Sequence, residues 1–75
     1  MKEYIVDPNE IFYFKPRDIW CIPRHLFPEE YSHSFKVREE VFINKEKYHV
    51  VGSAAFYKNS GPLNVDILFK KVLEN

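Results

Sequence analysis

The feature that most constrains this chain is the alternation of apolar and polar residues in its middle third. Apolar residues share one parity of this segment: Phe35, Val37, Val41 and Ile43. Polar residues share the other parity: Lys36, Arg38, Glu40 and Asn44. A period of two is typical of a strand with one buried face, so we expect a strand here. Glu39 interrupts the inward parity, which indicates a bulge or a strand boundary at that position.

A turn and a second strand follow this segment. Residues 44–47 form the short polar run NKEK, and the next residues are rich in β-branched side chains, so we predict a β-hairpin over residues 40–51. Gly52 permits a bend or bulge, after which residues 53–57 continue as strand. Residues 58–62, KNSGP, form the clearest loop signal in the chain.

The N-terminal part is broken up by proline. Four of the five prolines lie within residues 1–28, and proline cannot donate to a sheet ladder, so we expect short edge strands there. After Pro28 the sequence allows one helical turn. The strand-like pieces are residues 3–6, 11–14 and 18–22.

The C-terminal residues 64–75 fit two structures. Val65, Leu68, Phe69 and Val72 have helical spacing. In a strand, Val65, Ile67 and Phe69 would face inward, with Asp66 and Lys70 facing outward. The β-branched start after Gly-Pro favours the strand.

Short strands spaced about ten residues apart indicate an all-β protein, or a β-rich one with a single short helix. We expect a small SH3-like antiparallel barrel of five to six strands, with residues 1–75 as one domain. So short a chain buries only about 60% of its unfolded surface. Aromatic residues make up 17% of the chain, so much of the core is expected to consist of rings.

Charge and cysteine content limit the functional classes. Eleven basic residues balance eleven acidic ones, which argues against a strongly basic binder of phosphates. A single cysteine cannot form an intramolecular disulfide, which favours a reducing cytoplasm. No signal peptide or long apolar run is present. The small size and Ala-poor composition suit an accessory protein of a bacterium or its phage.

The segment RDIWCIPRHLFPEEYSHSF holds the residues that could bind a metal. Cys21, His25 and His33 follow one another closely, and His49 could supply a fourth ligand suited to zinc. Paired ligand motifs such as CxxC are missing, however. The alternative is a small buried Cys21 on a strand with the histidines at the surface, so we expect neither a metal nor another cofactor.

Nucleophilic catalysis is the second reading of the same residues. Cys21 would act as a thiolate with His25 or His33 as its base, which requires a nearby cation and an orienting group. No nucleophile motif is present, and so small a domain leaves little room for an enclosed pocket. We therefore expect a protein that is not an enzyme.

Binding is the favoured class, because the run IFYF at residues 11–14 cannot be buried on both faces of a strand. The segment DIWCIPRHLF at residues 18–27 is also rich in large apolar side chains, which either close the core or contact a partner. We expect a patch that binds another protein, or a second copy of the chain as a homodimer, and that consists of Tyr13, Trp20, Arg24, Leu26 and Phe27. The protein would then be an interaction module or a small inhibitor.

Nucleic-acid binding is the alternative function. Exposed rings could stack on bases while basic side chains contact phosphates. The rings available are Phe12, Tyr13, Phe14, Trp20 and Tyr57, and the basic residues are Lys15, Arg17, Lys58, Lys70 and Lys71. The neutral net charge makes this the second choice.

Overall fold

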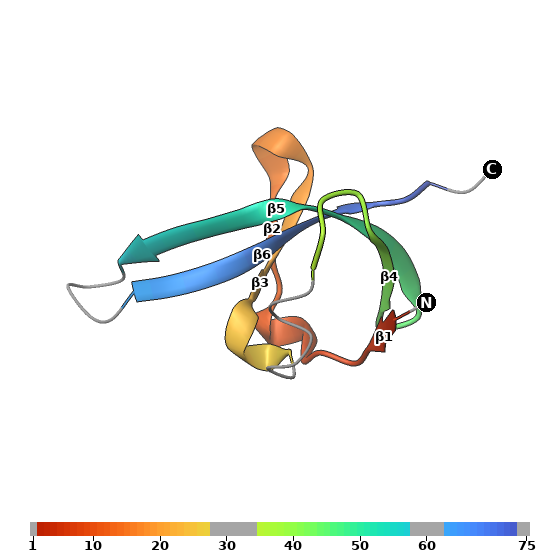
Figure 1. Cartoon of the computed structure of the whole chain (residues 1–75), viewed down its shortest axis with the longest axis horizontal. Coiled ribbons are helices and arrows are strands. Elements are labelled where there is room, and N and C mark those ends of the chain that lie inside the picture. The colour runs from red at the N-terminus through yellow and green to blue at the C-terminus, as the bar shows by residue number, and fades with distance from the viewer. Residues whose placement is uncertain (1, 28–34, 58–62, 74–75) are drawn as a thin grey trace.

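The strand-like segments assemble into one six-stranded sheet in the computed structural model, which describes residues 2–27, 35–57 and 63–73 (Figure 1). The strand order is β1-β4-β5-β6-β3-β2. The strands are β1 (Lys2–Tyr4), β2 (Phe12–Phe14), β3 (Ile19–Pro23), β4 (Glu40–Ile43), β5 (Glu46–Tyr57) and β6 (Leu63–Lys71). Three short 3-10 helices connect them: η1 (Pro8–Glu10), η2 (Lys15–Arg17) and η3 (Arg24–Leu26).

The all-β prediction is confirmed at the level of fold class, whereas two details differ. Strand β1 pairs with β4 in parallel, so the sheet is mixed and the expectation of an antiparallel sheet is wrong for this pair. Parallel neighbours need a long connection between them, because a short turn can join two strands only in antiparallel pairing. The sequence between β1 and β4, which includes β2 and β3, is long enough for this. The described sheet is also not closed, because β1 and β2 each have one neighbouring strand.

The predicted hairpin over residues 40–51 is confirmed. Strands β4 and β5 are joined by Asn44 and Lys45, whose φ angles are 50° and 68°. Two consecutive positive φ angles are typical of the hairpin turn whose twist matches that of the strands. The turn is therefore two residues long, because Glu46 and Lys47 already belong to β5.

The longest element is the hairpin of β5 and β6, which extends away from the rest of the sheet (Figure 1). The register shifts between Val50 and Gly52, so the bulge expected near Gly52 is confirmed. The preference for a strand at the C-terminus is confirmed by β6, in which Ile67 and Phe69 are buried. The loop predicted at residues 58–62 lies outside the described residues, as does the helical turn after Pro28.

The strand predicted to begin at Phe35 starts later than expected. The amide of Glu39 donates to the carbonyl of Lys36 at 2.9 Å, and Arg38 has a φ of 75°, so residues 36–39 form a tight turn. Val37 lies in this turn and is 64% exposed, although alternation predicted it to face inward. The boundary expected at Glu39 is confirmed, since β4 begins at Glu40.

The core lies on one face of the curved sheet and is rich in rings. Phe69 is fully buried, and its ring centroid lies 5.9 Å from that of Phe27 and 6.0 Å from that of Phe35. Aromatic pairs of this kind each contribute about 0.5–1.5 kcal/mol beyond their buried area. The buried apolar residues are Tyr4, Val6, Ile22, Phe27, Val41, Ile43, Tyr48, Val50, Ile67 and Phe69.

Candidate functional site

Strand β2 presents three neighbouring aromatic side chains to solvent. Phe12 is 61% exposed, Tyr13 is 42% exposed and Phe14 is 39% exposed, whereas Ile11 packs against the core. Alternation along a strand predicts two exposed residues in this run. The third is exposed because β2 lies at the edge of the sheet and has β3 as its one neighbouring strand.

The structure brings two of the predicted binding residues together. The rings of Tyr13 and Trp20 lie 4.3 Å apart between centroids, and the Tyr13 hydroxyl donates to Asp18 Oδ1 at 2.6 Å. Asp18 adopts a left-handed φ of 56°, which directs the chain from β2 into β3. Trp20 also meets Tyr48 edge-on at 5.6 Å. These contacts form a continuous series of rings from the exposed edge to the core.

The remaining predicted binding residues lie at η3 and divide into two groups. Arg24 is exposed, whereas Leu26 packs against the core. Phe27 is only 4% exposed and lies 5.0 Å from Tyr4 between ring centroids. Phe27 is therefore a core residue, which corrects its place in the expected surface patch. Phe27 closes the core because its ring packs against the rings of Phe35 and Phe69.

The candidate metal ligands are not assembled into a site within the part of the chain that the structure describes. Cys21 is half-buried in β3, His25 is exposed on η3 and His49 lies in β5. Residues 2–27, 35–57 and 63–73 contain no group of three or more His, Cys, Asp or Glu able to hold a metal ion. His33 lies outside the described residues.

The environment of Cys21 also disfavours a reactive thiolate. Burial raises the pKa of the Cys21 thiol, and the negative charge of Asp66 raises it further. A raised pKa lowers the thiolate fraction at neutral pH, which is the opposite of what nucleophilic catalysis requires.

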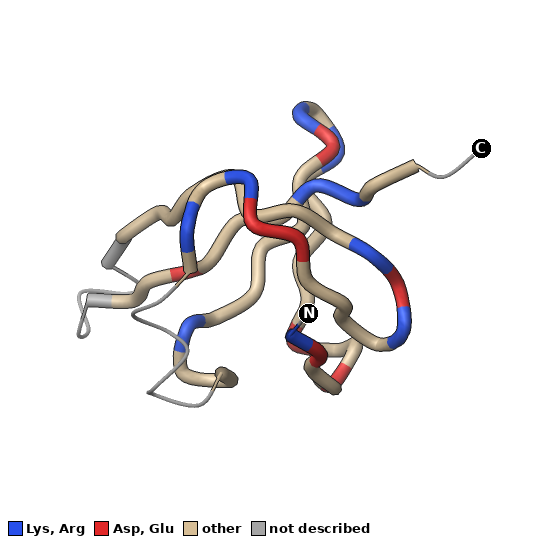
Figure 2. The backbone as a smooth tube through the Cα atoms, turned by 45° about the vertical axis from the view of Figure 1, so that its right-hand side comes forward, with Lys and Arg blue, Asp and Glu red and all other residues tan. Residues whose placement is uncertain are grey.

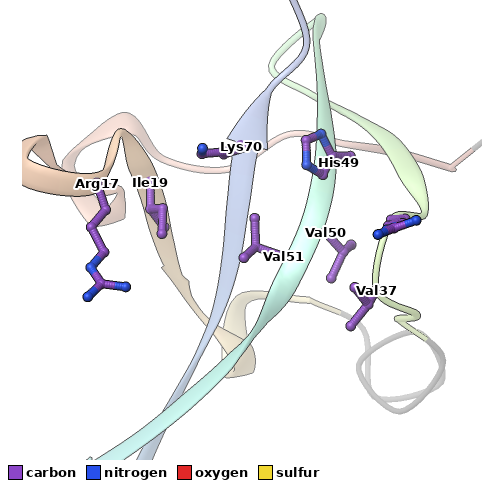
Figure 3. A pocket seen from close by; sticks show the side chains of 8 residues that line it. Arg17, Ile19, Val37, His49, Val50, Val51 and Lys70 are labelled. Atoms are coloured by element: carbon purple, nitrogen blue, oxygen red, sulfur yellow. The ribbon is translucent and has the colours of Figure 1, made fainter.

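A basic groove of about 540 Å³ lies across the sheet (Figure 3). It brings together Arg17 and Lys70, two of the basic residues expected to contact nucleic acid, with Arg38, which no sequence signal indicated. Among the described residues, its lining includes three cationic side chains and one histidine but no carboxylate: Arg17, Arg38, Lys70 and His49. Ile19 and Val51 contribute apolar surface between them. Nothing local in the sequence relates Arg38 or Val51 to Arg17, so alternation and turn signals do not identify them as site residues.

Strand pairing positions the groove residues. His49 on β5 faces Lys70 on β6 in the register, so these two side chains lie on the same face of the sheet. The amide of Arg38 donates to the carbonyl of Val50 at 2.7 Å, which attaches the 36–39 turn to β5. Arg17, on η2 before β3, lies on the opposite side of the groove from Val37 (Figure 3).

Comparison of the chain with protein-family models, with curated proteins and with solved structures gives no match. Within the described ranges, no helix has the length and apolar character needed to cross a lipid bilayer.

Proposed function

We propose that this protein is a small non-catalytic module that binds another protein through its edge strand β2. The observation that carries the proposal is the exposure of Phe12, Tyr13 and Phe14 in one edge strand, with Phe12 and Phe14 on one face and Tyr13 on the other. In a chain of 75 residues, large rings are needed to form the core, so three exposed neighbours favour a surface that is buried in a complex.

The proposed mode of binding is addition of a partner strand beside β2. An edge strand offers backbone donors and acceptors to an incoming strand, and this is a common mode of peptide recognition. Strand β2 has three residues, so backbone hydrogen bonds would be few and ring burial would supply most of the affinity. Phe12 and Phe14, whose centroids lie 6.5 Å apart, would form the central contact.

Several broader features of the proposal have supporting observations. The raised pKa of the Cys21 thiol disfavours this residue as a catalytic nucleophile, which supports a non-catalytic role. A single free cysteine favours a cytoplasmic protein, such as a bacterial or phage accessory protein. For the architecture, we propose an SH3-like barrel that is open between β1 and β2. The support is a curved six-stranded sheet whose two edges are joined by residues 5–11.

The test compares two serine variants that remove the same kind of surface at different places. Phe12→Ser/Phe14→Ser changes the β2 edge, whereas Ile5→Ser/Leu73→Ser changes two residues that are 80% and 85% exposed elsewhere. Each variant is used to capture proteins from the native cell with quantitative mass spectrometry. We expect a partner retained by the wild type and by the control but lost by the edge variant.

The captured partner is then purified and titrated against the protein. We expect amide hydrogen exchange at residues 12–14 to slow in the complex, since new strand pairing protects edge amides. A partner that binds the edge variant with wild-type affinity, or leaves residues 12–14 unprotected, would refute the proposal. Sedimentation equilibrium separates the two occupants, because a dimer that is lost in the edge variant identifies a second copy of the chain.

A further inference from the structure

We infer that the basic groove binds the phosphate backbone of a single-stranded nucleic acid. The groove is open, holds about 540 Å³ and is lined by Arg17, Arg38 and Lys70, with no carboxylate among the lining residues that the structure describes. Figure 3 shows Arg17 and Lys70 on the elements that border it, with His49 close to Lys70. Phe14 adjoins both this groove and the β2 surface, but the groove cations lie outside β2, so the inference does not depend on the proposed function.

Ion pairing separates the groove cations from other basic residues. Three lysines have carboxylate partners: Lys2 with Glu39 at 3.3 Å, Lys47 with Glu40 at 3.7 Å and Lys71 with Glu46 at 2.7 Å. Among the described residues, Arg17, Arg38 and Lys70 form no ion pair. Glu39 and Glu40 follow Arg38 in the sequence, yet their carboxylates pair with lysines instead.

The zero net charge therefore does not describe this surface. Figure 2 shows basic and acidic segments interspersed along the chain, so the charge balance holds for the molecule as a whole. In the groove the balance fails locally, because no carboxylate of the described residues pairs with its cations as carboxylates do with other lysines. Unpaired arginines and lysines are the usual contacts of phosphate groups.

The width of the groove fits a chain of phosphates better than one isolated phosphate. Arg38 lies on the β4 side of β5, where its amide bonds to Val50, and Arg17 precedes β3, so β5 and β6 both lie between the two arginines. Three strand spacings correspond to about 14 Å. Lys70 on β6 lies between the two arginines. Cations distributed over this distance can contact successive phosphates of one strand.

Aromatic side chains lie on the same face as the groove. Phe14 pairs with Ile19 across β2 and β3, and directly opposite residues share one face of a sheet. Ile19 also lines the groove, so the exposed ring of Phe14 adjoins it. Unpaired bases stack on such rings while cations hold the backbone, and this arrangement favours a single strand over a duplex.

The experiment measures fluorescence anisotropy of labelled oligo-dT and oligo-U of about 16 nucleotides, which exceeds the site of most small domains. Three phosphate contacts predict a slope of log K against log salt of about −2. Arg17→Gln, Arg38→Gln and Lys70→Gln should each reduce the magnitude of the slope by about 0.7. Lys45→Gln is the matched control, because Lys45 is exposed in the β4–β5 turn and does not line the groove.

A second variant tests stacking separately from charge. Phe14→Ser should weaken binding about tenfold and leave the salt slope unchanged. The inference is overturned if about 100 µM protein gives no binding at low salt, or if Lys45→Gln weakens binding as much as the groove variants. It is also overturned if an unlabelled duplex competes as well as a single strand. The glutamine variants retain the β2 rings, so their capture of a protein partner tests the proposed function independently.

Discussion

The side-chain amide of Asn44 forms two hydrogen bonds with the backbone of Val6. Asn44 Nδ2 donates to the Val6 carbonyl at 2.8 Å, and Asn44 Oδ1 accepts from the Val6 amide at 2.8 Å. The backbone N–H of Asn44 donates a third hydrogen bond, to the Tyr4 carbonyl at 2.9 Å. Asn44 therefore extends the pairing of β1 and β4 beyond the last strand residue, while its positive φ forms the β4–β5 turn.

Asn44→Ala should lower the free energy of unfolding by about 2–3 kcal/mol. Two hydrogen bonds to the buried Val6 contribute about 1 kcal/mol each, and a positive φ adds about 1 kcal/mol of strain for alanine. Urea unfolding measures the change. Asn44→Gly tolerates the positive φ and should lose about 2 kcal/mol. Two variants as stable as the wild type would contradict this role.

Phe27→Leu should destabilise the protein by about 1–3 kcal/mol, because it removes ring contacts with Tyr4, Phe35 and Phe69 from the core. Arg24→Ala, three residues away and exposed, should change stability by less than about 0.5 kcal/mol. Thermal or urea unfolding of both variants checks the difference. Equal effects would mean that the loop does not close the core.

Stability should fall at high pH through Tyr48. Burial, followed by the charge of Glu46 and its hydrogen bond, raises the pKa of the Tyr48 hydroxyl from 10.0 to about 12. Below pH 10 the hydroxyl is neutral in both the folded and the unfolded state. Between pH 10 and 12 it ionises more readily when unfolded, so stability is lost as pH rises through this window.

The measurement is urea unfolding from about pH 9 upward, with Tyr48→Phe as the control. The variant lacks the ionisable hydroxyl, so its stability should decline less steeply over the same range. An identical decline in the two proteins would show that Tyr48 does not cause it.

Cys21 should react with a disulfide reagent such as DTNB more slowly in the folded protein than in urea at the same pH. Burial and the Asp66 carboxylate both raise the pKa of its thiol, which lowers the thiolate fraction. Asp66→Asn removes one of these causes and should increase the folded-state rate. A folded-state rate above that of the unfolded chain would instead identify an activated cysteine.

Zinc removal should leave the protein unchanged. Cys21, His25 and His49 form no metal-binding group among the described residues. Protein purified without a His-tag should contain zinc well below one equivalent, and a chelator should not shift its melting temperature. Stoichiometric zinc together with a lower melting temperature after chelation would contradict this expectation.

The elements that were predicted correctly depend on neighbours in sequence. The β4–β5 hairpin follows from alternation on both sides of a short polar turn, and the bulge follows from Gly52. The turn at residues 36–39 was missed because Val37 and Arg38 fit the alternating pattern. The turn forms where the Arg38 amide donates to the carbonyl of Val50 on β5, a contact with a distant residue that the local pattern does not reveal.

The candidate sites were only partly predictable, because they too depend on contacts between strands that are distant in the sequence. An aromatic run such as IFYF implies that some rings are exposed, whichever strands surround it. Its position at an edge with one neighbour, and hence the exposure of a third ring, depends on the strand order. Phe27 and Tyr13 look equivalent as apolar residues near proline, yet one is buried and the other exposed.

By itself the sequence determined that the chain is all-β, where the β4–β5 hairpin turns, and that the rings of residues 11–14 have to reach the surface. These features follow from alternation and turn chemistry, which act over a few residues. Tertiary structure alone decided the parallel pairing of β1 with β4 and the basic groove. Both depend on which distant strands become neighbours and in what register. Arg17, Arg38 and Lys70 lie far apart in the sequence, and the pairing of β3, β6 and β5 brings them to one surface.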